Sequence, residues 1–118
     1  EIKLYSKIKI KIGGNIMKVL FVCSLGMSSA VAIKALEKEA YLKGVEIEVK
    51  AVSTQQFEDE IKNGYDVAMV APQIRHRYDT LNIKAKEIGI PCEMIIPQGY
   101  SPLGGPMLLK QIQGILNK

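Results

Sequence analysis

The sequence is poor in the residues that build disulfide frameworks and structural metal sites. Its 118 residues include two cysteines, Cys23 and Cys92, and one histidine, His76. Closed zinc sites and disulfide-stabilised folds need more cysteines or paired Cys-x-x-Cys motifs. The chain also lacks any apolar run near the roughly 20 residues that a membrane-spanning helix requires. We therefore expect a cytoplasmic protein without a structural metal, and we expect Cys92 to be a core residue.

Acidic and basic residues nearly balance over most of the chain. The formal net charge is +4, but residues 1–16 contribute +3 of it through four lysines and one glutamate. The other 102 residues carry 12 basic and 11 acidic side chains. The net charge of these 102 residues is so close to zero that they lack the basic face that binding to a nucleic-acid backbone requires. We therefore expect no nucleic-acid partner.

Residues 1–16 differ in character from the segment that follows them. Ile and Lys alternate over residues 7–12, a pattern that suits an exposed strand or an unstructured arm. Met17 then opens a much more apolar stretch. We expect residues 1–16 to be a non-native or disordered leader and residues 17–118 to form the functional domain. A basic arm that contacts a membrane surface is the alternative.

Strand-like and helix-like patterns alternate from Met17 onward. Apolar runs predict buried strands at 19–22 and 67–70, and edge strands are expected at 45–49 and 93–96. Apolar residues at helical spacing predict a helix after each strand, in the segments 30–43, 53–64, 78–88 and 106–116. This order predicts an α/β fold of the flavodoxin-like kind, a single-domain three-layer sandwich. Its four-stranded parallel sheet has the order 2-1-3-4, with helices on both faces.

The segment from Cys23 to Ala30 connects the first buried strand to the first helix. In a sheet of this order, ligands bind at the carboxyl ends of the central strands, where Cys23 and residues 71–73 are expected to meet. A cysteine before a helix N-terminus is surrounded by backbone N–H groups, which stabilise a thiolate and bind phosphate. The alternative is that Cys23 is an inert, buried apolar residue. The predicted site is the nucleophile Cys23 with a phosphate-binding loop of Ser24, Leu25, Gly26, Met27, Ser28, Ser29 and Ala30.

Three segments together carry a resemblance to a known family. Cys23-Ser-Leu-Gly-Met-Ser-Ser-Ala after an early strand resembles a phosphocysteine loop, and Ala71-Pro72-Gln73-Ile74 resembles a motif after the third strand. Tyr100 lies in a segment that resembles a Tyr-containing stretch before the last helix. The family is the lactose/cellobiose-class IIB subunit of the bacterial phosphoenolpyruvate-dependent sugar phosphotransferase system. The chain departs from it at Gly104, where many relatives have an acidic residue.

The resemblance implies a phosphoryl relay that needs no cofactor and no metal. A phosphohistidine on a IIA partner would phosphorylate the Cys23 thiolate. The phosphocysteine would then pass its phosphoryl group to a sugar, of the cellobiose or chitobiose type, held by a membrane IIC transporter. Backbone donors of the loop would stabilise the transferring group. Gln73 is either a supporting donor at the mouth of the site or a plain loop residue, and Tyr100 either caps the site or packs on the core.

Two other functions are compatible with the residues. Low-molecular-weight tyrosine phosphatases carry Cys-x5-Arg, in which the arginine binds phosphate bidentately. Here Ser29 occupies the arginine position, and Asp79 is the nearest candidate for the general acid that hydrolysis needs. The second alternative is an interaction module with an inert Cys23. The cluster Arg75/His76/Arg77 is either a docking site for an acidic partner or a solvent-exposed face, and we expect a monomer with transient interfaces.

Overall fold

The computed structural model describes residues 16–24 and 27–116. Residues 1–15 of the predicted leader and Leu25 and Gly26 of the predicted loop lie outside this part. The elements in chain order are β1 (Met17–Val22), α2 (Met27–Leu42), β2 (Ile47–Val52), α3 (Thr54–Glu60), β3 (Val67–Val70), the 3-10 helix η1 (Pro72–Arg77), α4 (Tyr78–Glu87), β4 (Cys92–Met94), the 3-10 helix η2 (Pro97–Gly99) and α5 (Gly105–Leu116). Within the described ranges, no helix combines the length and the apolarity that crossing a bilayer requires.

The four strands form one parallel sheet of order β2-β1-β3-β4, which confirms the predicted order 2-1-3-4. β1 lies between β2 and β3, and Val22 is paired with Val52 on one side and with Val70 on the other. These three strands therefore end level with one another. The connections that follow them begin at the same edge of the sheet, which is where the predicted site lies.

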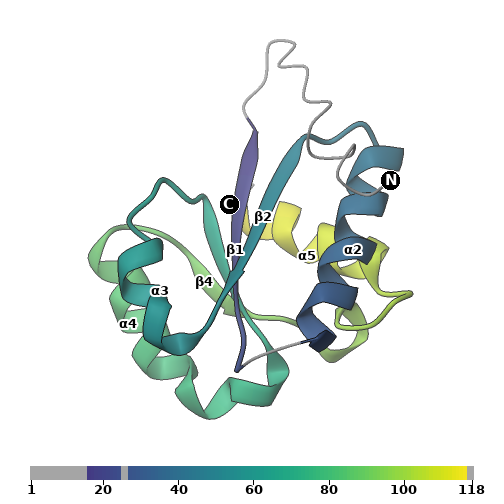
Figure 1. Ribbon diagram of the computed structural model, residues 1–118. Coiled ribbons are helices and arrows are strands. Elements are labelled where there is room, and N and C mark those ends of the chain that lie inside the picture. Colours follow the sequence, from purple (N-terminus) through teal and green to yellow (C-terminus); the bar gives the residue numbers. More distant parts are fainter. Residues whose placement is uncertain (1–15, 25–26, 117–118) are drawn as a thin grey trace.

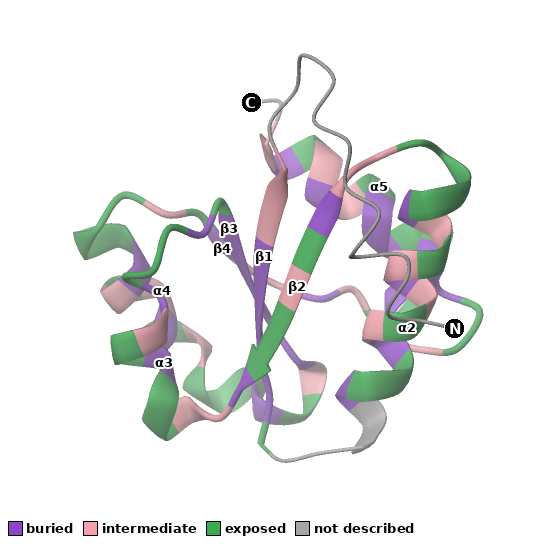
Figure 2. Ribbon diagram, turned by 45° about the horizontal axis from the view of Figure 1, so that its top comes forward, coloured by how far each residue is buried: buried purple, intermediate pink, exposed green. Residues whose placement is uncertain are grey.

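Helices cover both faces of the sheet, as predicted, with α2 and α5 on one face and α3 and α4 on the other (Figure 1). Side chains of β1 alternate between the two cores. Leu20 and Val22 pack towards α3 and α4, whereas Val19 and Phe21 pack towards α2 and α5. Figure 2 shows the contrast with β2, an edge strand that exposes much of its length. The predicted burial of the central strands on both faces is confirmed.

The contact between α2 and α5 requires a glycine at the start of α5. A Cβ atom at Gly105 would overlap the backbone carbonyl oxygen of Ala35 in α2. The neighbouring Gly104 is equally constrained, because a Cβ there would lie 2.7 Å from the carbonyl oxygen of Gly99. A side chain at Gly104 would therefore require the backbone around Gly99 to shift.

Several features of the fold differ from the sequence-based expectation. The helix expected at 30–43 begins at Met27, so the last four residues of the predicted loop lie in α2. The edge strand expected at 45–49 spans Ile47–Val52. The segment after β3, expected as a loop, forms η1, for which Pro72 supplies the favoured first residue. The last strand was expected at 93–96 but spans Cys92–Met94. Beyond the strand, the Ile95 N–H donates to the Val70 carbonyl oxygen at 2.9 Å and the Ile96 N–H donates to Oε1 of Gln111 in α5 at 3.1 Å.

Candidate active site

Cys23 is the first residue after β1, at the carboxyl edge of the sheet. Its backbone N–H donates to the Val52 carbonyl oxygen at 3.0 Å, which fixes the cysteine beside the end of β2. Its Sγ lies 3.2 Å from Ser29 Oγ and 4.0 Å from the Val52 carbonyl oxygen. The residue is only 8% exposed. The sulfur is therefore held in one position between the start of α2 and the end of β2.

Ser29 lies in the first turn of α2, and its hydroxyl group accepts the hydrogen bond from the Cys23 sulfur. It is 3% exposed. A hydroxyl both donates and accepts, so Ser29 accepts a hydrogen bond from the thiol and donates one to the thiolate. The first turn of a helix also carries partial positive charge. The sulfur thus lies beside a hydroxyl group and the first turn of a helix.

A pocket of about 500 Å³ opens beside the sulfur. The end of β2 and the start of α3 form its other wall. The lining residues are Cys23, Ser29, Ala51, Val52, Ser53, Gln55 and Gln56. The sequence analysis missed this wall. The available signal was the Ser53/Gln56 capping box directly after β2, because in a parallel sheet that connection lies at the same edge as Cys23.

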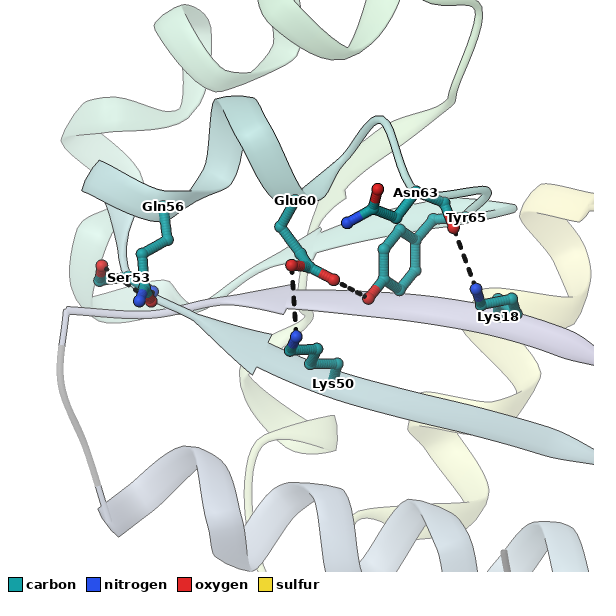
Figure 3. A network of polar contacts seen from close by, with 7 residues as sticks. All are labelled: Lys18, Lys50, Ser53, Gln56, Glu60, Asn63 and Tyr65. Atoms are coloured by element: carbon teal, nitrogen blue, oxygen red, sulfur yellow. Dashed lines mark hydrogen bonds and ion pairs between the residues drawn. The ribbon is translucent and has the colours of Figure 1, made fainter.

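A polar network fastens α3 to the sheet and so holds this wall in place (Figure 3). At the start of α3, the Ser53 N–H donates to Gln56 Oε1 at 3.3 Å as part of a capping box. At its end, the Tyr65 hydroxyl donates to Glu60 Oε2 at 2.6 Å. Lys50 on β2 lies 3.2 Å from Glu60 Oε1. The helix is thus attached at both ends.

The same contacts govern the ionisation of Glu60 and Tyr65. The hydrogen bond from Tyr65 is the main reason that the pKa of Glu60 lies below its ordinary value, and Lys50 adds to the effect. Burial, followed by the same hydrogen bond, raises the pKa of Tyr65. Near neutral pH the pair is therefore a phenol that donates to a carboxylate. Lys18 lies 4.9 Å from the centre of the Tyr65 ring and adds a cation–π contact.

The remaining predicted residues take different positions. Ser24 and Ala30 are exposed. Gln73 is exposed in η1 and is not among the described residues that line the pocket. Tyr100 is half-buried and packs against both hydrophobic cores, and it is not among the described residues that line this pocket. Met27 and Ser28 are the first two residues of α2.

The second cysteine lies in a different environment. Cys92 begins β4, is 5% exposed and belongs to the core under α3 and α4, as expected. Burial raises the pKa of its thiol to about 12, so it is not a nucleophile near neutral pH. Among the described residues, no three His, Cys, Asp or Glu side chains are grouped closely enough to hold a metal ion. Cys23 is thus the cysteine with access to a pocket.

Comparisons with known proteins agree with this architecture. Residues 18–102 match the family described as "PTS system, Lactose/Cellobiose specific IIB subunit". A galactose-specific EIIB component from Lactococcus lactis subsp. cremoris is 24% identical over 103 residues, which cover 84% of this chain and 95% of that protein. An oligo-beta-mannoside-specific EIIB component from Bacillus subtilis is 24% identical over 99 residues, with the same coverage.

Solved structures show the same fold. The cellobiose-specific phosphotransferase IIB component from Borrelia burgdorferi is 28% identical, with a TM-score of 0.70 over 87% of this chain and 94% of that one. The lactose-specific IIB component domain from Streptococcus pneumoniae is 23% identical, with a TM-score of 0.69 over 85% of this chain and 97% of that one. The match over residues 18–102 covers well over half of the sequence. The chain therefore belongs to the lactose/cellobiose-specific IIB subunits of the phosphotransferase system.

Proposed function

We propose that the chain is a phosphocarrier that takes a phosphoryl group from a phosphohistidine on a IIA protein and holds it on Cys23. It then passes the group to a sugar bound by a membrane IIC transporter. The observation that carries the proposal is the position of the Cys23 sulfur in a member of this family. The sulfur lies at the carboxyl end of β1, contacts the buried Ser29 hydroxyl at 3.2 Å and faces an open pocket.

Each transfer exchanges one bond to phosphorus for another. In the first step, the Cys23 thiolate attacks phosphorus, the P–S bond forms, the P–N bond breaks and the electron pair returns to the imidazole nitrogen. In the second step, a sugar hydroxyl oxygen attacks phosphorus and loses its proton to a base of the transporter. The P–S bond then breaks and the sulfur leaves as a thiolate. The Ser29 hydroxyl stabilises that developing negative charge, and backbone N–H groups of the loop from Ser24 to Ala30 bind the phosphoryl oxygens.

The lining of the pocket favours a carrier over a hydrolase. A phosphatase of the Cys-x5-Arg type places an arginine where Ser29 stands. It also needs a carboxylic acid to protonate the leaving group. No arginine, aspartate or glutamate is among the described residues that line the pocket beside Cys23. The described lining therefore does not match that of a Cys-x5-Arg phosphatase, which favours a carrier.

The proposal extends to the partners and to the cellular setting. Arg75, His76 and Arg77 are all exposed on η1, which follows β3 at the same edge of the sheet as Cys23. We assign them to docking of an acidic IIA surface. The protein acts in the cytoplasm as a monomer with transient partners, and its sugar is a disaccharide of the cellobiose or chitobiose type. Replacing Arg75 and Arg77 by Glu tests the docking role, because unchanged IIA-dependent transfer kinetics would contradict it.

The test of the carrier function is an intact-mass measurement. The protein and its Cys23→Ser variant are incubated with phosphoenolpyruvate, the general phosphotransferase proteins and a cellobiose-class IIA protein. We expect one added phosphate on the parent protein and none on the variant. Cys92→Ser serves as the matched control and is expected to gain the phosphate normally. A parent protein that stays unphosphorylated beside several active IIA proteins would refute the proposal.

A further inference from the structure

The pocket beside Cys23 continues into a second hollow of about 390 Å³ along the edge of the sheet. The two share four lining residues and so form one groove, which we call the β2–α3 groove. The shared residues are Ala51, Val52, Gln55 and Gln56. Lys50, Asp59 and Glu60 line only the far hollow. The groove therefore runs from the sulfur, between β2 and α3, to a charged end.

Two polar side chains of α3 face this groove without a partner. Gln55 and Asp59 are four residues apart and so lie on the same face of the helix. Within the described ranges, neither side chain makes a hydrogen bond or an ion pair, whereas Gln56 and Glu60 beside them are both engaged. The network described above holds α3 in place. The backbone of Gln55 and Asp59 is thus held in place by the contacts of α3. Their polar side-chain atoms have no hydrogen-bond partner within the described ranges.

The chemistry of the groove fits a neutral sugar attached to a phosphoryl group at the sulfur end. An amide donates and accepts hydrogen bonds, and a carboxylate accepts several, which matches neighbouring hydroxyl groups that do both. Lys50 and Glu60 neutralise each other, so the Asp59 carboxylate leaves the far end with negative charge. That charge repels a phosphate and favours its placement at the Cys23 end. The two hollows also have volumes in the range usual for small-molecule sites.

We infer that the β2–α3 groove binds the acceptor sugar during the second transfer, with Gln55 and Asp59 contacting its hydroxyl groups. This inference rests on the proposed function, because it assumes that Cys23 donates its phosphoryl group to a sugar. Gln55 and Asp59 are then specificity-determining residues. The sugar is shared at that moment between the transporter and this protein, so the groove contributes to the choice of acceptor.

A direct test is an NMR titration of the isolated ¹⁵N-labelled protein. The probes are glucose 6-phosphate, galactose 6-phosphate and, as a control for the loop alone, inorganic phosphate. We expect at least one sugar phosphate, and not inorganic phosphate, to shift the amide signals of residues 50–60. Gln55→Ala and Asp59→Ala are each expected to weaken that binding about 3- to 10-fold. Glu87→Ala, which removes an exposed carboxylate from α4, is expected to leave the affinity unchanged.

A second measurement separates the two transfer steps. The same variants are expected to gain phosphate from the IIA protein at the parent rate and to raise the KM for sugar in transfer to transporter-containing vesicles. Identical shifts from all three probes would overturn the inference. So would variants that slow the IIA step and leave the sugar step unchanged, since the groove would then serve IIA docking. A Cys23 that never gains phosphate would refute the proposed function instead, and the titration would still decide what the groove binds.

Discussion

Removing the Ser29 hydroxyl tests whether the contact at 3.2 Å from the Cys23 sulfur assists phosphoryl transfer. A hydrogen bond to a charged group contributes about 1.5–3 kcal/mol. Sulfur is a weak acceptor, so we take the lower end, which corresponds to roughly a tenfold change in rate. The charge on sulfur develops as the P–S bond breaks. Ser29→Ala is therefore expected to slow transfer from phosphocysteine to the sugar about 10-fold.

The assay follows the loss of phosphate from the pre-phosphorylated protein by intact mass after mixing with transporter-containing vesicles and sugar. Ala is a good helix former, and the change removes one buried oxygen, so urea unfolding is expected to show a small change in stability. Thr80→Ala, which removes an exposed hydroxyl from α4, is the matched control. A Ser29→Ala protein that is correctly folded and transfers within twofold of the parent rate would refute the assigned role.

Three further predictions concern stability and thiol chemistry. Gly105→Ala would place a Cβ against the Ala35 carbonyl oxygen and is expected to lower the free energy of unfolding by roughly 1–3 kcal/mol; an unchanged urea midpoint would contradict this packing. Because burial raises the pKa of Cys92 to about 12, iodoacetamide at pH 8 is expected to leave Cys92 unmodified in the native protein, and peptide mapping after alkylation checks this. The pKa of Glu60 lies below its ordinary value of 4.5, chiefly through the Tyr65 hydrogen bond. Its contribution to stability is present above that value and is lost as the pH falls through the lowered pKa; thermal unfolding between pH 3 and 6 is expected to show a weaker pH dependence in Tyr65→Phe, and parallel curves would contradict it.

The central part of the fold was predictable from local patterns because its strands are buried on both faces. The run at Val19–Val22 has no polar side chain, which is typical of the middle of a parallel sheet. Gly44 and Gly89 end helices at positive φ, where glycine is favoured. The position of Cys23 between such a strand and a helix then follows from the chain order alone. These signals lie within a few residues of the feature that they predict.

The groove was only partly predictable in this way, because its walls come from segments that are distant in the sequence and its local signal was the capping box after β2. Cys23 and Gln55 line the same pocket only because β1 and β2 pair in register and end together. The hydrogen bond between Gln111 in the last helix and the backbone after β4 has a similar origin. The packing of the Tyr100 ring against both cores is likewise a contact between distant segments. Side-chain contacts across the fold decide such positions, and they leave no local pattern.

The two edges of the sheet bear on how the protein meets other chains. An open strand edge is a template for further strands and a common starting point for aggregation. Here β2 exposes the charged residues Glu48 and Lys50, and at the opposite edge β4 is only three residues long. Charged residues and short strands both discourage edge-to-edge pairing. Both edges of the sheet are thus poor templates for a further strand, which disfavours polymerisation through strand pairing.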